Sequence, residues 1–495
     1  MPGEYVIIDT MPGITRLEIR DEVNVKFHDL DPSTRRRCEA KLKYQLPYAY
    51  HVPAFRLGRW DGKISFFTTA GATYLNLLDR VLPIIGEEGW QVEIDDRRQP
   101  QNFNFPEVTE DTFAHILWPK GHPAEGKPVM LRDYQVEIIN RFLQNTQGVQ
   151  EIATGAGKTL MTAGMSKCAE PYGRTLVIVP NKDLVRQTHA DYVNLGLDVG
   201  VYFGDEKDLT HTHTIATWQS INSLVKKVKE GTSAVGIEAL TDGLIAVIVD
   251  EVHMAKADVL RQLLTGIFAN VPLRWGLTGT IPKDEHEYIS LIACLGEVLH
   301  RLQASELQDI GVLSACHVKV LQYDDKVEYK TYQEELSYLT TNERRMDELA
   351  KTIGAIGLTG NTLVLVDRIT AGKMLVERLP DSVFVSGAMK SKDRKEEYDE
   401  ITVSDNKIIV ATYGVAAVGI NIPRIFNLVL LEPGKSFVRV IQSIGRGIRK
   451  AQDKDFVQIW DVTSTAKFAK RHLSKRKKFY DDANYPYETI KVQYK

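Results

Sequence analysis

Residues 153–159 read Ala-Thr-Gly-Ala-Gly-Lys-Thr and form the strongest local signal in this chain. Glycines at positions 155 and 157 let backbone N–H groups approach a phosphate chain. Lys158 would neutralise the β- and γ-phosphate oxygens, and the Thr159 hydroxyl would bind Mg²⁺. Residues 160–169 are predicted to form a helix whose N-terminus adds a positive dipole end. The strict pattern G-x-x-x-x-G-K-[ST] is incomplete, because Ile152 occupies its first glycine position.

From Leu131 onward, short apolar runs alternate with stretches of helical pattern. Continuous apolar runs separated by helices indicate a parallel sheet that is covered on both faces. There are too many such units for one small domain, so we expect two α/β domains that divide near residues 300–320. Residues 95–130 are rich in Pro, Gln, Asn and charge, which is typical of a linker. The apolar runs are 175–179, 245–249, 363–366, 408–410 and 428–431.

The composition of the 495 residues is that of a globular protein, with 43% hydrophobic and 8% aromatic residues. At roughly 150 residues per domain, about three domains are expected. The formal net charge of -3 excludes a wholly basic or acidic protein, so any polyanion site must be a local patch. No apolar run approaches the ~18 residues that span a bilayer, and the start of the chain lacks a secretion pattern. We therefore expect a soluble cytoplasmic protein. Its four cysteines form no C-x-x-C pair, which disfavours zinc and redox motifs.

The second chemical signal is Asp250-Glu251-Val252-His253, which directly follows the apolar run 245–249. Its carboxylates therefore lie at the C-terminal end of a buried strand, where open α/β sheets form their ligand sites. One carboxylate can hold Mg²⁺, and its neighbour can orient or deprotonate a water molecule. Two acids at a strand end are often merely solvated. Together with the glycine loop, however, they predict a site that hydrolyses a nucleoside triphosphate.

Further polar motifs follow in order along the chain. Gln135 shortly precedes the glycine loop, and its amide could read an adenine edge. Arg446 and Arg449 lie on one face of a predicted helix, from which both could reach a γ-phosphate across a domain cleft. The other motifs are 179–187, 217–220, 277–280, 411–421 and 442–445.

As a set, these motifs resemble those of superfamily 2 helicases, with a DEVH form of the DExH box. The similarity covers residues 131–461. It implies an α/β fold with two RecA-like parallel-sheet motor domains, preceded by a small α+β N-terminal domain. It also implies an ATP hydrolase with ATP and Mg²⁺ as cofactors. The expected divisions are 1–115 for the small nucleic-acid-binding domain with its linker, 116–310 for motor domain 1, 311–463 for motor domain 2, and 464–495 for a basic tail packed on domain 2.

The resemblance also implies roles residue by residue. Catalysis would fall to Lys158, Asp250, Glu251, Arg446 and Arg449. ATP would be bound by Arg132, Gln135, Gly155, Gly157, Lys158, Thr159 and Gly419, with Thr159 and Asp250 holding Mg²⁺. Hydrolysis would be coupled to domain movement by His253, Thr278, Thr280 and Gln442. The nucleic-acid track would be lined by Asn181, Gln187, Thr217, Trp218 and Thr412. Asn421 stands where the family often has Asp, so the resemblance does not fix which contacts this residue makes to the ribose or to an arginine.

A closer similarity, to phage recombination helicases, lies mostly outside the generic motifs. It implies an enzyme that unwinds and branch-migrates forks, D-loops and Holliday junctions in the host cytoplasm. We expect a monomer when free, DNA as partner, and single-strand-binding or recombination proteins beside it. Three alternatives stay open: a helicase of RNA or RNA–DNA hybrids, a duplex DNA translocase that does not separate strands, and an ATP-gated nucleic-acid clamp. The similarity rests on residues 55–62, 330–335, 411–415 and 460–461.

Because the net charge is close to zero, affinity for nucleic acid would come from local basic patches. In the N-terminal patch, Trp60 could stack on a base, but packing in the core is the simpler interpretation. The tail is predicted to form an amphipathic helix on the second motor domain, either binding DNA or merely solvated. The N-terminal cations are Arg35, Arg36, Arg37, Lys41, Lys43, Arg56, Arg59 and Lys63, of which Arg35, Arg56, Arg59 and Lys63 are the expected DNA contacts. The tail cations are Lys467, Lys470, Arg471, Lys475, Arg476, Lys477 and Lys478.

Overall fold

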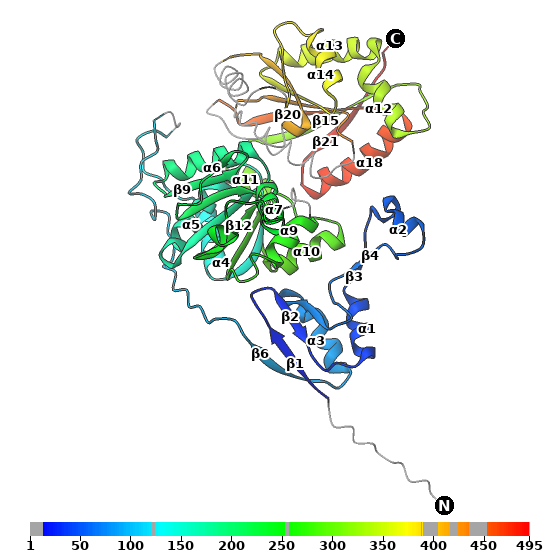
Figure 1. Cartoon of the computed structure of the whole chain (residues 1–495). Coiled ribbons are helices and arrows are strands. Elements are labelled where there is room, and N and C mark those ends of the chain that lie inside the picture. The colour runs from blue at the N-terminus through cyan, green and yellow to red at the C-terminus, as the bar shows by residue number, and fades with distance from the viewer. Residues whose placement is uncertain are drawn as a thin grey trace, which may run out of the picture. The chain divides into compact units, whose positions relative to one another are not determined.

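The computed structural model describes residues 13–120, 124–252, 257–387, 389, 404–415, 424–434 and 453–494 (Figure 1). The chain divides into two compact units, which are described separately below. The first contains residues 1–150 and 159–300, and the second contains residues 151–158 and 301–495.

The N-terminal domain is a small α+β layer within the first unit. Its mixed sheet has the order β5-β2-β1-β6, in which β1 pairs antiparallel with β2 and parallel with β6. Asp31 caps α1 by accepting hydrogen bonds from the amides of Ser33 and Thr34 at 2.6 and 3.0 Å, and Pro32 follows in the first turn. The elements are β1 Ile14–Ile19, β2 Asn24–Phe27, α1 Pro32–Lys41, β5 Ala72–Tyr74, α3 Leu78–Glu87 and β6 Gln91–Asp96.

Residues 43–65, which we call the arm, leave this layer as a two-stranded antiparallel ribbon of β3 (Lys43–Gln45) and β4 (Lys63–Ser65). Figure 1 shows the short helix α2 (Pro53–Arg56) beyond the ribbon. Strand β4 directly follows the turn at residues 60–62. Trp60 is half-buried and contacts Phe55 edge to face within the arm. The expectation that Trp60 packs in a core is therefore wrong.

The first motor domain holds an eight-stranded sheet of order β10-β9-β11-β8-β12-β13-β7-β14. Strands β9, β11, β8, β12 and β13 pair in parallel with one another, which confirms the predicted parallel α/β sheet, and the short edge strand β10 pairs antiparallel with β9. Its strands are β7 Gln147–Ile152, β8 Arg174–Val179, β9 Val199–Phe203, β10 Glu206–Lys207, β11 His213–Thr217, β12 Leu244–Asp250, β13 Leu273–Thr278 and β14 Val298–Leu302. Its helices are α4 Asp133–Leu143, α5 Lys158–Ala169, α6 Lys182–Asn194, α7 Trp218–Lys229, α8 Glu238–Thr241, α9 Ala257–Thr265 and α10 Glu285–Leu295.

Helix α10 joins the N-terminal domain to this motor domain. Leu291, Cys294 and Leu295 belong to the core of the motor sheet. Ile289 and Ile292, on another face of the helix, belong to the core of the N-terminal domain. A helix that is apolar on all sides must be covered on all sides, and α10 is covered by the two domains together.

Residues 97–130 contain none of the named helices or strands over their described part, as expected of a linker, but they pack against the first motor domain. Val108 and Phe113 are buried, and the Val108 amide donates to Asn140 Oδ1 at 2.8 Å. The linker expectation is therefore corrected: the segment is irregular but docked.

The second motor domain is a seven-stranded sheet of order β17-β18-β16-β19-β20-β15-β21, in which all pairs are parallel. Its strands are β15 Ala315–Tyr323, β16 Thr362–Val366, β17 Val383–Val385, β18 Ile408–Thr412, β19 Asn427–Leu431, β20 Phe456–Ser464 and β21 Tyr487–Val492. Its helices in the described residues are α11 Ala304–Asp309, α12 Tyr332–Thr341, α13 Glu343–Gly357, α14 Ile369–Val376 and α18 Lys467–Asp482.

The tail forms the predicted helix, α18, and then adds the edge strand β21 beside β15. Arg476 is buried on the inner face of α18, where it makes two hydrogen bonds to Asp461, at 2.8 and 2.9 Å, and one to the carbonyl of Gly434 at 2.7 Å. Arg476 was expected to be one of seven exposed tail cations. It is instead an internal ion-pair partner, because helical periodicity places it on the same face as Leu473 and Tyr480.

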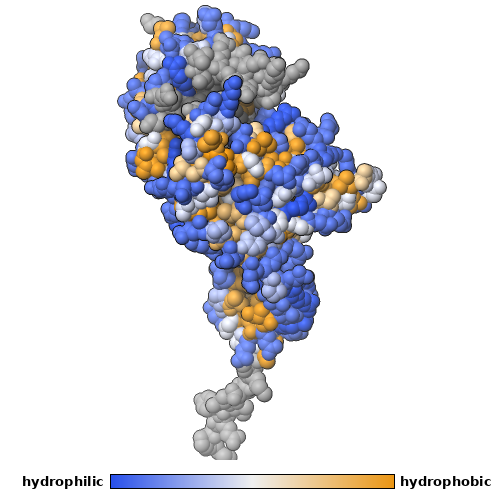
Figure 2. Space-filling view, turned by 90° about the vertical axis from the view of Figure 1, so that its left-hand side faces the viewer, coloured by the Kyte–Doolittle hydropathy of each residue, from blue (hydrophilic) through white to orange (hydrophobic). Residues whose placement is uncertain are grey.

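Among the described residues, no helix is long and apolar enough to cross a bilayer. Hydrophilic residues cover much of the face shown in Figure 2, and apolar residues form patches between them.

Candidate functional site

The glycine loop follows β7 and leads into α5, which confirms the helix predicted after the loop. Gly155 and Gly157 have φ angles of 93° and 84°, in the left-handed region that glycine adopts without strain. Lys158 is the first residue of α5, and its Nζ donates to the carbonyl of Ile152 at 3.5 Å. A glycine loop that opens into a helix N-terminus presents amides to an anion, so these residues fit the phosphates of ATP.

The acidic motif lies at the end of β12. Asp250 is the last residue of the strand, and its Oδ1 accepts from the Glu251 amide at 2.9 Å. Glu251 is buried and has a φ of 51°, which is uncommon for a residue with a side chain. Its Oε2 accepts a hydrogen bond from the Gly279 amide at 3.3 Å. The Glu251 carboxylate is thereby hydrogen-bonded to the turn that follows β13. Backbone strain at a residue whose side chain is held in this way is typical of functional sites.

That turn contains Thr278 and Thr280, the two residues expected to couple hydrolysis to movement. Thr278 Oγ1 donates to the Thr280 carbonyl at 2.7 Å and accepts from the Thr280 amide at 3.2 Å. The Thr280 hydroxyl is buried and has no hydrogen-bond partner within the described part of the chain. Burying a hydroxyl without a hydrogen-bond partner costs free energy of folding. The Thr280 hydroxyl is therefore suited to form a hydrogen bond with a polar ligand in the site.

The glycine loop, the acidic motif and the threonine turn share one edge of the sheet. Asp250 on β12 is paired with Leu277 on the parallel strand β13. Strand β13 runs in the same direction as β7, because the Arg274 amide donates to Thr146 O and a Cβ on Gly276 would lie 3.1 Å from Val149 Cγ2. Carboxyl ends of parallel strands meet at one edge, where α/β sheets bind ligands.

Gln135 and Arg132 lie at the start of α4. Gln135 is buried, and its Oε1 accepts from the Arg132 amide at 3.0 Å, which caps the helix. The Arg132 guanidinium donates to the hydroxyl of Tyr134 at 3.1 Å. Five predicted site residues lie outside the described residues: His253, Gly419, Gln442, Arg446 and Arg449.

A groove of about 650 Å³ brings together two residues of the predicted nucleic-acid track, Asn181 and Thr217. Asn181 lies just after β8, Thr217 is the last residue of β11, and each caps the next helix. Asn181 Oδ1 accepts from the Leu184 amide at 3.0 Å, and Thr217 Oγ1 accepts from the Ser220 amide at 3.3 Å. The Asn181 Nδ2 is buried without a partner among the described residues, so it can donate to a ligand in the groove.

Three lysines that the sequence did not single out also line this groove. They come from three separate segments, with one acid, Asp205, among the lining residues. Cations together with amide and hydroxyl groups suit a phosphate backbone, which binds through charge and polar contacts without reading bases. The lysines are Lys182, Lys207 and Lys227.

The other predicted track residues lie elsewhere. Gln187 is exposed on α6 and does not line the groove. Trp218 packs partly against the motor core. Thr412 ends β18 in the second unit, where its Oγ1 accepts from the Val415 amide at 3.4 Å.

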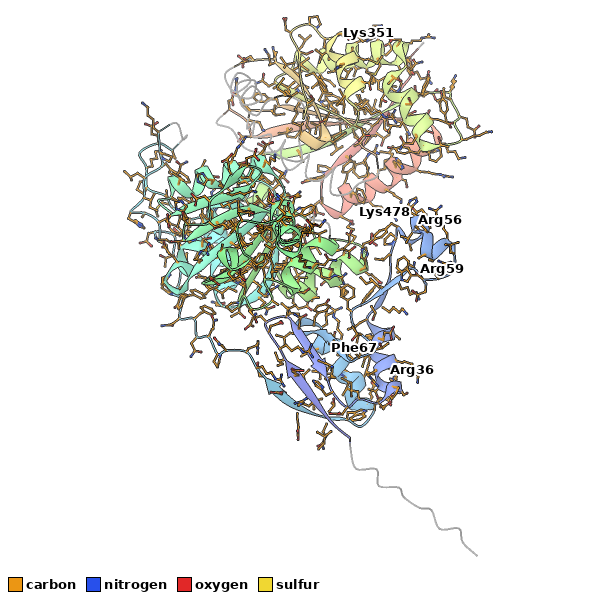
Figure 3. All side chains as sticks on the ribbon, in the orientation of Figure 1. Arg36, Arg56, Arg59, Phe67, Lys351 and Lys478 are labelled. Atoms are coloured by element: carbon orange, nitrogen blue, oxygen red, sulfur yellow. The ribbon has the colours of Figure 1, made fainter. Side chains whose placement is uncertain are left out.

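The N-terminal basic patch is partly neutralised. Arg37 pairs with Glu87 at 2.9 Å and also with Glu88, and Lys43 pairs with Asp61 at 3.0 Å. Among the described residues, the four cations expected to contact DNA form no salt bridge, although Arg35 and Arg56 donate to backbone carbonyls. Figure 3 shows Arg56 and Arg59 on the arm and Arg36 on α1. Within the described part of the chain, the patch cations without a salt bridge are Arg35, Arg36, Lys41, Arg56, Arg59 and Lys63.

Comparison with known proteins matches both motor domains. Residues 128–283 match the family described as type III restriction enzyme, res subunit, and residues 345–451 match the helicase conserved C-terminal domain. The ATP-dependent DNA helicase UvsW of Enterobacteria phage T4 is 25% identical over 489 residues, which are 92% of this chain and 94% of that protein. The DNA 3'-5' helicase XPB of Kineococcus radiotolerans is 24% identical over 372 residues, 73% of this chain and 64% of that protein.

Among solved structures, the chain is similar to a fragment of a putative HsdR subunit of a type I restriction enzyme from Vibrio vulnificus. The similarity covers 95% of this chain and 85% of that fragment. Its TM-score is 0.53 at 18% identity, which supports the fold. Both motor domains are thus matched in their chain order, and the glycine loop after β7 and the buried Glu251 after β12 lie within the first matched range. The chain accordingly belongs to the superfamily 2 helicases and is an ATP-dependent helicase.

Proposed function

We propose that this helicase acts on DNA and that it unwinds and branch-migrates forks, D-loops and Holliday junctions in recombination and repair. The observation that carries the proposal is that two surfaces suited to a phosphate backbone lie in one compact unit. One is the lysine-lined groove of the motor domain, and the other is the arm, whose Arg56, Arg59 and Lys63 form no salt bridge among the described residues. The relatives named above are DNA helicases, which favours DNA over RNA.

The nucleotide site supplies the energy in this proposal. ATP with Mg²⁺ would provide the phosphoryl group that is transferred to water. The loop amides and Lys158 would bind the phosphate chain, while Thr159 and Asp250 would hold the ion. Glu251 would orient the attacking water and accept its proton, since its carboxylate is buried and fixed by Gly279. By the family resemblance, Arg446 and Arg449 would stabilise the charge on the transferred phosphoryl group.

The groove would hold the strand along which the motor moves. Asn181 and Thr217 are fixed by their capping bonds, so their positions change only if the helices that they cap move. Backbone contacts of this kind carry no base information. Preference for branched DNA must therefore come from a second surface, which we assign to the arm.

A strand-displacement assay tests the proposal. Substrates would be a four-way junction, a fork, a linear duplex and an RNA–DNA hybrid, each with ATP and Mg²⁺ at one salt concentration. We expect strand separation that is faster on the junction and the fork than on the linear duplex. Displacement of a triplex strand without duplex separation would instead indicate a duplex translocase, and ATP hydrolysis without any displacement would indicate a clamp. Activity confined to the hybrid would overturn the DNA assignment.

A further inference from the structure

The N-terminal domain contacts helix α9 at both ends and in its middle. Near its start, the Tyr48 hydroxyl of the arm donates to Asp258 Oδ2 at 3.1 Å. In the middle, the guanidinium carbon of Arg261 lies 5.2 Å from the centre of the Phe66 ring. At its end, Asn24 Nδ2 donates to the carbonyl of Thr265 at 2.9 Å. The helix is therefore held along its length by a domain outside the motor.

Arg261 is the central contact. Its Nη2 lies 3.2 Å from Asp258 Oδ1, one turn earlier on α9, so the Tyr48 contact and the Phe66 contact converge on the same pair of residues. Phe66 is buried in the core of the N-terminal domain. A planar guanidinium can stack on an aromatic ring and pair with a carboxylate at once, which a lysine ammonium does not reproduce.

The buried leucines of α9 pack into the core of the motor domain. Leu260 and Leu264 share one buried cluster with Val252, the residue that follows Glu251. Protein interiors are close-packed, so a displacement of α9 is transmitted to Val252 rather than absorbed. The Glu251 carboxylate accepts a hydrogen bond from the Gly279 amide at 3.3 Å. A small shift of a catalytic group can change a rate strongly.

We infer that the N-terminal domain controls the nucleic-acid-stimulated part of ATP hydrolysis through α9, with Arg261 as the residue that transmits the movement of this domain to the motor. The inference rests on the proposed function, since nucleic acid bound by the arm is the input. Binding at the arm moves the Tyr48–Asp258 and Phe66–Arg261 contacts together, and the packed face of α9 carries that movement to the strand end that bears Glu251.

The test compares Arg261→Ala, Arg261→Lys and Tyr48→Phe with the unmodified protein. The turnover number and KM for ATP would be measured without nucleic acid and with a saturating four-way junction. We expect Arg261→Ala to lower the junction-stimulated turnover at least about fivefold, with unstimulated turnover, KM and junction affinity changed less than about twofold. Arg261→Lys should recover little. Tyr48→Phe, which removes one partly exposed hydroxyl and leaves the core intact, should give a smaller loss in the same direction.

Arg80→Ala is the matched control. Arg80 also joins the N-terminal domain to the motor domain, through Glu297 at 3.4 Å, but it does not contact α9. We expect normal stimulation in this variant. Hydrogen exchange of residues 257–265 gives a readout independent of activity: junction binding should slow it in the unmodified protein and leave it unchanged in Arg261→Ala.

Three results would overturn the inference. They are equal loss of stimulated and unstimulated turnover in Arg261→Ala, equal loss in Arg80→Ala, and normal stimulation in both Arg261→Ala and Tyr48→Phe. Failure of the proposed function looks different, because the unmodified protein itself would then show no stimulation by DNA.

Discussion

The carboxylate of Glu251 accepts a hydrogen bond from the amide of Gly279, which links the end of β12 to the turn after β13. Glu251 has a φ of 51° and is buried, so its carboxylate is placed at a cost in backbone energy. Two hydrogen bonds between the Thr278 hydroxyl and the Thr280 backbone stabilise the same turn. Glu251, which is expected to activate water, is therefore hydrogen-bonded to the turn that contains Thr278 and Thr280, the residues expected to couple hydrolysis to domain movement.

Glu251→Gln should lower the turnover number for ATP by at least about 100-fold, because the amide cannot accept a proton from water. Binding of ATP should change little, since the phosphate loop is untouched. The measurement is steady-state phosphate release together with nucleotide affinity. Glu238→Gln, at an exposed acid on α8, serves as the control and should be neutral. Near-normal turnover in Glu251→Gln would contradict the assignment of the site.

Lys227→Ala should weaken binding of single-stranded DNA to a similar degree for all sequences, because the residue lines the groove as a phosphate contact. The slope of log affinity against log salt should fall by about 0.7. Lys229, two residues later on the same helix, does not line the groove, and Lys229→Ala should leave the slope unchanged. An unchanged slope in Lys227→Ala would exclude the groove as the track.

Arg476→Met should destabilise the second motor domain by about 3–5 kcal/mol, because it leaves the buried Asp461 carboxylate without its ion-pair partner. Urea unfolding measures the effect. Lys478→Met, at an exposed position on the same helix, should cost less than about 0.5 kcal/mol. If both variants unfold at the same urea concentration, Arg476 contributes no more than a surface charge.

The buried side chain of His213 should make the free energy of unfolding depend on pH. The side chain is buried, with Nδ1 2.7 Å from Thr175 Oγ1, and burial lowers its pKa from 6.5 to about 4. Between these pH values the unfolded chain binds a proton that the folded chain does not, so the free energy of unfolding should fall as the pH falls from 6.5 to about 4. The slope is at most about 1.4 kcal/mol per pH unit. His213→Gln should lack this component, and a variant with an unchanged pH profile would refute it.

Local chemistry was readable from the sequence. The glycine loop, the helix after it and the acids at a strand end all depend on neighbouring residues and on strand alternation, and the structure has each of them in the predicted place. The helical tail was readable for the same reason.

Tertiary partners were not readable. The burial of Arg476 depends on Asp461, which is remote in sequence, and a basic helix gives no sign of which cation turns inward. Helix α10 has apolar residues that any motor core could use, so its sequence does not reveal that one face serves the N-terminal domain. The groove lysines come from three segments that only the folded sheet brings together.

The measurement that tests the account most directly is the steady-state ATPase rate at fixed salt without nucleic acid and with single-stranded DNA, duplex DNA, a four-way junction or RNA. The account predicts strong stimulation by DNA, and stronger stimulation by the junction than by linear DNA. Stimulation by RNA alone would contradict it.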